Sequence, residues 1–265
     1  PVQRYGGCRH EVVNRMSLQI DSVWTIDAAL LLYFMHGGFG FYEAGMCHMK
    51  NTVDTLTHNL MILAVTIPVY WAVGFALMYG RGNGFMGLDG FLPQMLTGKE
   101  VIYPALLAYP VPLAVAFAYA GGYADTPATL IAGTGAERIH LVAVMLLTVL
   151  ISGFLFPVVG HWLVGGGWLS QLRIPVYDTG SGLVQLCGGC CALAVALVLG
   201  PRRGERSDGK RARQQEVSSM PLVFLGAFIL WLGFLAFNTG FAMKVSRLTG
   251  LIVVNTVLAG AAGTI

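Results

Sequence analysis

Long stretches of the chain are hydrophobic on every side and contain no Asp, Glu, Lys or Arg. These charge-free stretches cover residues 55–80, 101–124, 139–172, 179–201, 217–243 and 248–265. Each is close to or above the about 20 apolar residues that a helix needs to cross a bilayer. A further run, residues 28–42, lies between Asp27 and Glu43. It becomes long enough if both carboxylates lie at the membrane interfaces. The pattern therefore predicts an all-α, polytopic membrane protein.

Seven membrane-spanning helices follow from this pattern. Their predicted ranges are 22–46, 56–80, 105–134, 139–165, 179–200, 219–243 and 248–265. Pro110, Pro112 and Pro127 predict a kink in the third of them. A soluble domain with one large core is the alternative. It would need helices with a polar face, whereas these segments are apolar all round.

Composition agrees with a membrane protein. Hydrophobic residues make up 55% of the chain and charged residues 11%, against about 25% charged residues in soluble domains. The chain does not begin with Met and shows no signal-peptide pattern. It ends within the apolar run 251–265. We expect the sequence to be cut at both ends.

Basic residues gather in the connection 201–218 between the fifth and sixth predicted spans. They are Arg202, Arg203, Arg206, Lys210, Arg211 and Arg213. The positive-inside rule places this loop in the cytoplasm. Counting back through the predicted spans then places the N-terminus outside, and we expect a plasma-membrane location. The loop is short, has interleaved acids and contains no aromatic residue, so we expect no nucleic-acid partner.

The sequence shows no pattern of an enzyme, and we expect no metal or cofactor. It contains no nucleophile elbow, no paired carboxylates and no ligand-spaced histidine cluster. Cys187, Cys190 and Cys191 have the spacing of a metal or redox site. They lie in an apolar run beside small residues, however, where cysteine packs as a small hydrophobic side chain.

The first predicted span is rich in glycine, which lets a neighbouring helix approach its backbone closely. Its sequence His36-Gly37-Gly38-Phe39 is echoed in the sixth span by Asn238-Thr239-Gly240-Phe241. Similar segments in corresponding halves of a chain are typical of the inverted repeats of transporters.

Eight short motifs occur in order along nearly the whole chain. They are Gly38-Phe39 with Glu43-Ala44-Gly45, Lys50-Asn51, Ala136-Glu137-Arg138, Pro157 with His161-Trp162, Gly180-Ser181-Gly182, Leu199-Gly200-Pro201-Arg202, Phe237-Asn238 and Asn255-Thr256. Together they resemble the ammonium transporter family, which includes the yeast ammonium permeases and the Rhesus glycoproteins.

The resemblance implies an eleven-helix fold of two inverted five-helix repeats, assembled as a homotrimer with one pore in each subunit. This chain, residues 1–265, would hold the first repeat and the start of the second. The implied substrates are ammonium and ammonia, with methylammonium as a further candidate.

Family pores recruit the cation in an aromatic vestibule and pass it between two stacked rings. The ring positions of this gate fall on Tyr123 and on Phe237, which Asn238 follows. Carrying a charge through a dry apolar bore costs about 2.5–3.5 kcal/mol on the mildest scales. The attraction of a cation to aromatic faces offsets part of this cost.

Other pore positions depart from the family pattern. The first pore histidine falls on Gln185, the vestibule tryptophan on Val164, and a serine or threonine of the vestibule on Phe241. The structural aspartate falls on Tyr177, with Asp178 next to it, and the second pore histidine lies beyond residue 265. A neutral amide cannot relay a proton as imidazole can. Two readings therefore stay open: a transporter with a divergent pore, and an ammonium sensor or transport-poor regulatory relative on the same scaffold.

Three further polar residues lie near the expected pore. Asp125 lies about 200° around the helix from Tyr123, so we expect it to face away from the pore. Its neighbours Gly121, Gly122 and Thr129 predict a close helix contact with hydrogen bonding. His36 either packs as a satisfied buried side chain or faces the lumen. His161 belongs to the His-Trp motif and is expected to be structural.

Overall fold

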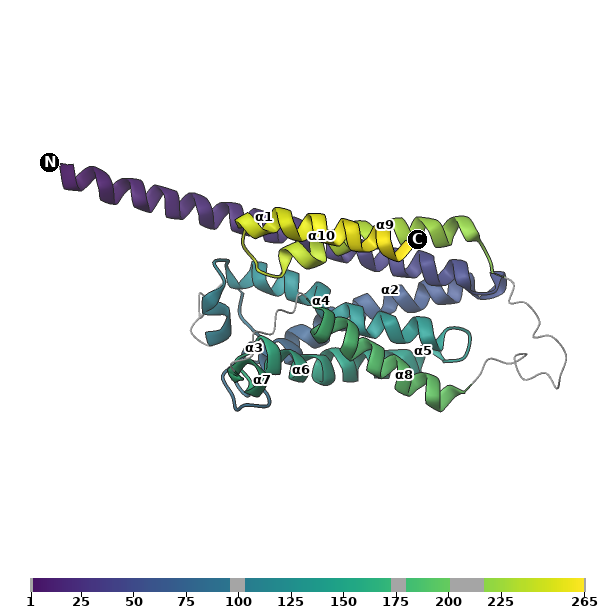
Figure 1. Ribbon diagram of the computed structural model, residues 1–265. Coiled ribbons are helices and arrows are strands. Elements are labelled where there is room, and N and C mark those ends of the chain that lie inside the picture. Colours follow the sequence, from purple (N-terminus) through teal and green to yellow (C-terminus); the bar gives the residue numbers. More distant parts are fainter. Residues whose placement is uncertain (1, 96–102, 173–179, 201–216, 265) are drawn as a thin grey trace.

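The computed structural model describes residues 2–95, 103–172, 180–200 and 217–264, with side chains from residue 16 onward except that of residue 181. These residues form a bundle of long, roughly parallel and antiparallel helices (Figure 1). The α-helices are α1 (Val2–Met46), α2 (Thr52–Val69), α3 (Phe75–Tyr79), α4 (Leu113–Gly135), α5 (Leu141–Leu150), α6 (Phe156–Leu163), α7 (Trp168–Gln171), α8 (Cys187–Leu199), α9 (Met220–Gly240) and α10 (Arg247–Thr264). The fold is thus all-α, as the sequence predicts.

Three π-helical turns interrupt or open the long helices. Tyr70–Gly74 joins α2 to α3, Ile151–Leu155 joins α5 to α6, and Ser181–Leu186 leads into α8. The first two turns pack on each other, since a Cβ on Gly74 would lie 2.5 Å from the carbonyl oxygen of Ser152. Such turns occur frequently at functional sites.

Within the part of the chain that the structure describes, six helical segments are long and apolar enough to cross a membrane. They are Met16–Met46, Met49–Tyr79, Leu141–Gln171, Gly182–Leu199, Met220–Gly240 and Arg247–Thr264. The helix α1 also extends beyond the predicted span, back to Val2. The polar residues of this extension lower its hydropathy, so it was not predicted as part of the span, but they do not prevent helix formation. It projects from the bundle in Figure 1.

In the segment predicted to span residues 105–134, a short 3-10 helix covers Pro104–Ala108 and the α-helix begins only at Leu113. Pro110 and Pro112 were predicted to kink it, but they precede its first turn. Proline fixes φ and disfavours helical geometry in the residue before it. Only Pro127 lies inside α4.

The helix α9 lies beside the C-terminal half of α1 (Figure 1). Glycines make this approach possible: a Cβ on Gly38 would lie 2.8 Å from a side-chain methyl of Ile229, and one on Gly45 would lie 2.8 Å from the backbone nitrogen of Val223. On the α9 side, Gly226 packs on the backbone of Tyr42. The predicted role of the glycines in the first span is therefore confirmed.

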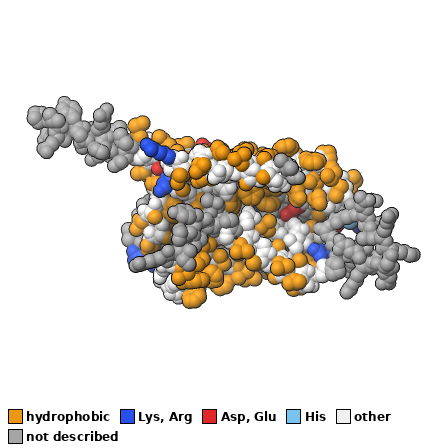
Figure 2. All heavy atoms as spheres, viewed as in Figure 1, with side chains coloured by type: hydrophobic (Ala, Val, Ile, Leu, Met, Phe, Trp, Pro, Cys, Tyr) orange, Lys and Arg blue, Asp and Glu red, His pale blue; other side chains and the backbone are white. Residues whose placement is uncertain are grey.

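The helix α4 lies in the interior and buries most of its residues. The outer surface is largely apolar, unlike the surface of a typical soluble protein. Figure 2 shows hydrophobic side chains over the middle of the visible face, with Lys and Arg toward its ends. Leu197 and Val198 of α8 are 75% and 86% exposed, and α10 has no buried residue. Such faces suit contact with lipid.

Three helix connections meet at one end of the bundle. Oε1 of Glu137, in the turn after α4, accepts hydrogen bonds from the backbone N–H of His48 at 2.7 Å and from Nδ2 of Asn51 at 3.0 Å. Arg138 donates to the carbonyl of Gly200, and the N–H of Ser218 donates to the carbonyl of Cys47 at 2.8 Å. The turns after α1, α4 and α8 therefore lie together.

Candidate functional site

Two aromatic rings from distant helices stack in the interior. Tyr123 of α4 and Phe237 of α9 have ring centroids 4.3 Å apart and planes 23° apart. Both side chains are buried, with exposures of 3% and 1%. We call Tyr123 and Phe237 the gate pair. The sequence assigned these two positions to a stacked gate, and the structure brings them together.

Hydrogen bonds hold the gate pair. Because α9 ends at Gly240, the carbonyl of Phe237 is among the last four of the helix, which lack the usual helical partner. It accepts hydrogen bonds from the hydroxyls of Tyr123 at 2.6 Å and Tyr119 at 2.7 Å. A phenylalanine at position 123 could not make this bond. The tyrosine therefore fixes one ring of the gate to the backbone of the other.

The Gly-Ser-Gly motif lies against these rings. Gly180 has φ of +106°, which a residue with a side chain rarely adopts. A Cβ at this position would also collide with the ring of Phe237 and lie 2.7 Å from that of Tyr123. The π-helical turn Ser181–Leu186 follows directly and carries Gln185. The motif thus positions this turn beside the gate pair.

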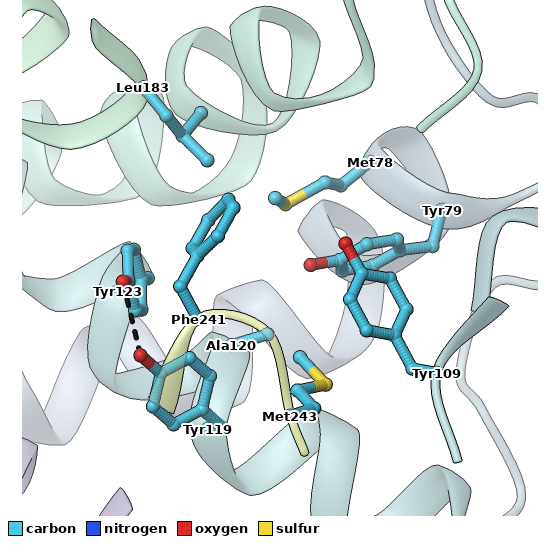
Figure 3. Close-up of a pocket in the computed structure, with 9 residues that line it drawn as sticks. All are labelled: Met78, Tyr79, Tyr109, Tyr119, Ala120, Tyr123, Leu183, Phe241 and Met243. Carbon is cyan, nitrogen blue, oxygen red and sulfur yellow. Dashed lines mark hydrogen bonds between the residues drawn. The ribbon is translucent and has the colours of Figure 1, made fainter. Parts of the chain in front are cut away.

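A small cavity adjoins the gate pair (Figure 3). We call it the outer cavity. Its lining residues are Met78, Tyr79, Tyr109, Tyr119, Ala120, Tyr123, Leu183, Phe241 and Met243. Phe241 points into its centre, and its ring centroid lies 5.7 Å from that of Tyr123. The lining as described contains aromatic rings, thioethers and hydroxyls but no charged side chain. This chemistry suits a cation held by ring faces and hydroxyl oxygens.

The remaining predicted pore residues lie outside this cluster. Val164 ends α6 and packs against the core. Asn238 donates through Nδ2 to the hydroxyl of Thr256 at 3.0 Å and so joins α9 to α10. Nε2 of Gln185 is buried and has no hydrogen-bond partner among the described residues. Tyr177 and Asp178 lie outside the described residues.

His161 fastens α6 to the connection that follows α3. Its Nδ1 lies 2.9 Å from the carbonyl oxygen of Met78 and its Nε2 lies 3.0 Å from that of Asn83. The side chain is 3% exposed. Since Met78 also lines the outer cavity, His161 supports the wall of the cavity without lining it.

His36 and Asp125 lie away from the gate pair and contact each other. Nδ1 of His36 pairs with Oδ2 of Asp125. A Cβ on Gly121 would lie 2.7 Å from the hydroxyl oxygen of Tyr33, and one on Gly122 would lie 2.9 Å from Cβ of Leu32. The close contact predicted around Asp125 is therefore present, and its partner helix is α1. No pattern in the sequence predicts that Asp125 pairs with His36.

Sequence reasoning also missed most of the outer cavity. Tyr119 precedes Tyr123 by one helical turn, so the spacing could have placed both on one face. Tyr79, Tyr109 and Met243 come from segments far apart in the chain, and only the tertiary packing brings them together.

A family model described as the Ammonium Transporter Family matches residues 23–265. Ammonium transporter Amt2 of Archaeoglobus fulgidus is 34% identical over 258 residues, which cover 94% of this chain and 53% of that protein.

This chain is also similar to solved structures of other proteins. One described as Sensor Amt Protein has a TM-score of 0.84 and 30% identity, covering 93% of this chain and 60% of the other. Mep2 of Candida albicans has a TM-score of 0.78 and 27% identity, covering 90% and 52%. The chain thus spans little more than half the length of these relatives.

Proposed function

The chain belongs to the ammonium transporter family, an integral membrane family of transporters rather than enzymes, and from this premise we propose that it moves ammonium or ammonia across the membrane through a divergent pore. The outer cavity receives the cation. The gate pair admits it toward Gln185. The observation that carries the proposal is the stacked gate pair at the wall of a cavity lined by tyrosine and phenylalanine.

The attraction of the cation to aromatic faces offsets part of the hydration energy that it loses on entering the cavity. Each ring contact is worth about 0.5–2 kcal/mol, more where solvent is excluded. The vestibule tryptophan is absent at Val164, but Phe241, Tyr79 and Tyr109 line the outer cavity. We infer that these rings take over the recruitment of ammonium or methylammonium.

Passage beyond the gate pair differs from histidine-dependent conduction. The amide of Gln185 cannot titrate near neutral pH, so it cannot relay a proton. Its buried Nε2 has no partner among the described residues, and an N–H donor of this kind can bind the lone pair of ammonia. Binding with weak conduction is therefore the expected behaviour.

An ammonium sensor on the same scaffold is the second candidate. Two observations favour it: the amide at position 185, and the hydroxyl of Tyr123 that bonds to Phe237 and holds the gate pair closed. The relatives carry both kinds of description, a transporter in Amt2 and a sensor in the Sensor Amt Protein.

The family also suggests the assembly and topology. We propose a homotrimer in the plasma membrane, with α4 as a seventh span in addition to the six segments above. In this arrangement the loop 201–218 is cytoplasmic and the N-terminus lies outside.

Uptake by the full-length protein tests the proposal. Cells lacking their own ammonium uptake would express the protein, and methylammonium uptake would be measured. Gln185→His together with Val164→Trp should raise uptake, the tryptophan alone contributing a few-fold to about thirtyfold by its ring contact. Phe241→Ala should not raise it.

Two results separate the candidates. Ammonium binding by the purified protein without uptake, even in the double variant, would favour the sensor. Robust uptake by the unmodified protein that is unchanged in Gln185→Ala would contradict the proposed role of this residue.

A further inference from the structure

Three ionisable side chains are buried between α1, α2 and α4, on the side of α4 away from the gate pair. His36 and Glu43 lie on α1 and Asp125 lies on α4; they are 6%, 8% and 3% exposed. Ionisable residues inside a membrane are costly and usually have a function. Neither the outer cavity nor the gate pair uses them.

The hydrogen bonds of His36 determine how many protons its site holds. Nε2 lies 2.7 Å from the backbone carbonyl oxygen of Asn59. A carbonyl oxygen only accepts, so Nε2 carries a proton. Nδ1 pairs with Oδ2 of Asp125 and lies 3.1 Å from the hydroxyl of Thr129.

A neutral imidazole protonated on Nε2 has a lone pair at Nδ1. That lone pair would face an ionised carboxylate oxygen, and the two would repel each other. One more proton between Nδ1 and Oδ2 removes the repulsion, whether it resides on the ring or on the carboxyl group. In both forms the His36 and Asp125 pair is electrically neutral, which suits its burial.

Neighbouring polar groups extend this pair. Nδ2 of Asn59 donates to Oε2 of Glu43 at 2.7 Å. Oδ1 of Asp125 and Oδ1 of Asn59 are buried and have no hydrogen-bond partner among the described residues. These acceptors are free to bind a water molecule, the usual partner of buried unsatisfied groups.

Few other titratable groups face the pair. Tyr33 on α1 donates its hydroxyl to the carbonyl of Ala118 at 2.9 Å. On α2, His58 faces Asp54 at 3.6 Å. The helix α9, which packs on the other side of α1, contains no Asp, Glu, Lys, Arg or His from Met220–Gly240. The helix α8 packs on α4, and its only titratable side chains are cysteines.

We propose that His36 and Asp125, with Asn59, Thr129 and Glu43 around them, form an intramembrane binding site for one proton, outside the pore. The proton joins α1 to α4, on the side of α4 away from Tyr123. The site does not require Gln185 to titrate, and it is independent of whether the protein transports or senses ammonium.

Solid-state NMR of the full-length protein in lipid bilayers tests the site directly. In this chain His36 is the one histidine that follows a methionine. Carbonyl-13C methionine with 15N histidine therefore distinguishes His36 from the other histidines of residues 1–265 without mutation. The side-chain 15N shifts give the protonation of both ring nitrogens, and infrared spectroscopy gives the carboxyl C=O band that Asp125→Asn removes.

At neutral pH we expect one of two spectra, both of which show the shared proton. Either both ring nitrogens of His36 are protonated, or Asp125 has a protonated carboxyl band and Nδ1 accepts from it. A neutral His36 beside an ionised Asp125 would overturn the proposal, and this result needs no variant.

Variants sharpen the assignment. In Asp125→Asn the new amide can donate to Nδ1, so His36 should become neutral while the fold persists. The matched control Thr126→Val, one residue along α4, removes a hydroxyl that donates to the carbonyl of Gly122 at 3.3 Å and should leave the shared proton in place. If Asp125→Asn folds and His36 still has both nitrogens protonated, Asp125 is not the partner and the proposal fails.

Discussion

The gate pair shows how one hydroxyl changes the properties of an aromatic gate. Stacking alone allows the rings of Tyr123 and Phe237 to slide or rotate apart. The bond from the Tyr123 hydroxyl to the carbonyl of Phe237 adds a directional restraint at 2.6 Å. The closed arrangement is thus stabilised by an interaction that two phenylalanines would lack.

The substitution Tyr123→Phe should loosen the gate. The Phe237 carbonyl keeps its bond from Tyr119, so no buried acceptor is left without a partner. Loss of the hydrogen bond should lower the free energy of unfolding by about 0.5–1.5 kcal/mol. If the full-length protein transports, methylammonium uptake should rise by up to about tenfold, since about 1.4 kcal/mol corresponds to that factor.

Tyr103→Phe is the matched control for this prediction. Its hydroxyl bonds to the carbonyl of Gly90, and neither residue lines the outer cavity. It should lower stability without raising uptake. Equal uptake in Tyr123→Phe and the unmodified protein would show that the hydroxyl does not limit opening.

Single residues were predictable where a local motif fixed their place. Tyr123 and Phe237 follow from their distance to Ala136-Glu137-Arg138 and from Phe237-Asn238. The partner of Asp125 did not follow, because no local rule specifies which face of α1 meets α4. The tyrosines of the outer cavity depend on the path of the connections after α3 and before α4, which hydrophobic patterning does not determine.

At the level of helices, glycine placement controls how closely α1 and α9 pack. Gly38→Ala should destabilise the protein, because the added Cβ would lie 2.8 Å from a methyl of Ile229 and 3.1 Å from the backbone nitrogen of Leu230. Overpacking of this kind typically costs about 1–3 kcal/mol. Thermal unfolding in detergent would measure the loss.

Gly37→Ala supplies the control from the preceding residue. Nothing lies within 4 Å of a Cβ at this position, and alanine favours the helix over glycine by about 1 kcal/mol. It should therefore be neutral or stabilising. Similar losses from both substitutions would show that helix packing at Gly38 is not the cause.

The turns after α1 and α4 are joined by Glu137. Its partial burial alone would raise the pKa, but hydrogen bonds from the backbone N–H of His48, from Asn51 and from the His48 ring outweigh this and lower the pKa of Glu137. A lowered pKa in the folded state stabilises the fold above the unfolded value of about 4.3. This contribution is lost as pH falls through the lower, folded pKa.

Glu137→Gln should therefore be less stable than the unmodified protein at neutral pH. This difference in stability should become smaller in acid. Unfolding temperatures measured from neutral pH to below about pH 4 would test this. The comparison variant Asp54→Asn changes a mostly exposed carboxylate and should have little effect. A difference between Glu137→Gln and the unmodified protein that stays constant with pH would contradict the role of the charge.

Most helices were predictable from hydropathy, and their ends were less so. Apolar runs located α2, α5, α8, α9 and α10. They could not show the π-helical turns, because such a turn changes the spacing of the backbone hydrogen bonds and not the apolar character of the run. The start of α4 required weighing Pro110 and Pro112 against the apolar run that contains them.

For the whole molecule, exposed apolar faces indicate further packing partners. The helix α10 has no buried residue, and Leu197 and Val198 of α8 are largely exposed. Lipid can cover such faces, and so can neighbouring subunits. We predict that the full-length protein purifies as a trimer, which mass measurement in detergent would detect. A purely monomeric protein over a range of concentrations and mild detergents would contradict it.

The orientation of the chain in the membrane follows from the three connections that meet at one end of the bundle. Lys50 and Arg138 lie at this end, and the basic loop 201–218 begins and finishes there. The positive-inside rule places this end in the cytoplasm. The connection that contains Leu88 should then face outside.

In a background without native cysteines, Leu88→Cys should react with a membrane-impermeant maleimide in intact cells, because Leu88 is 56% exposed. Ser207→Cys should react only after the membrane is permeabilised. The reverse result would mean that the orientation is inverted. Reaction of both in intact cells would mean that an even number of spans separates them, and α4 would then not cross the membrane.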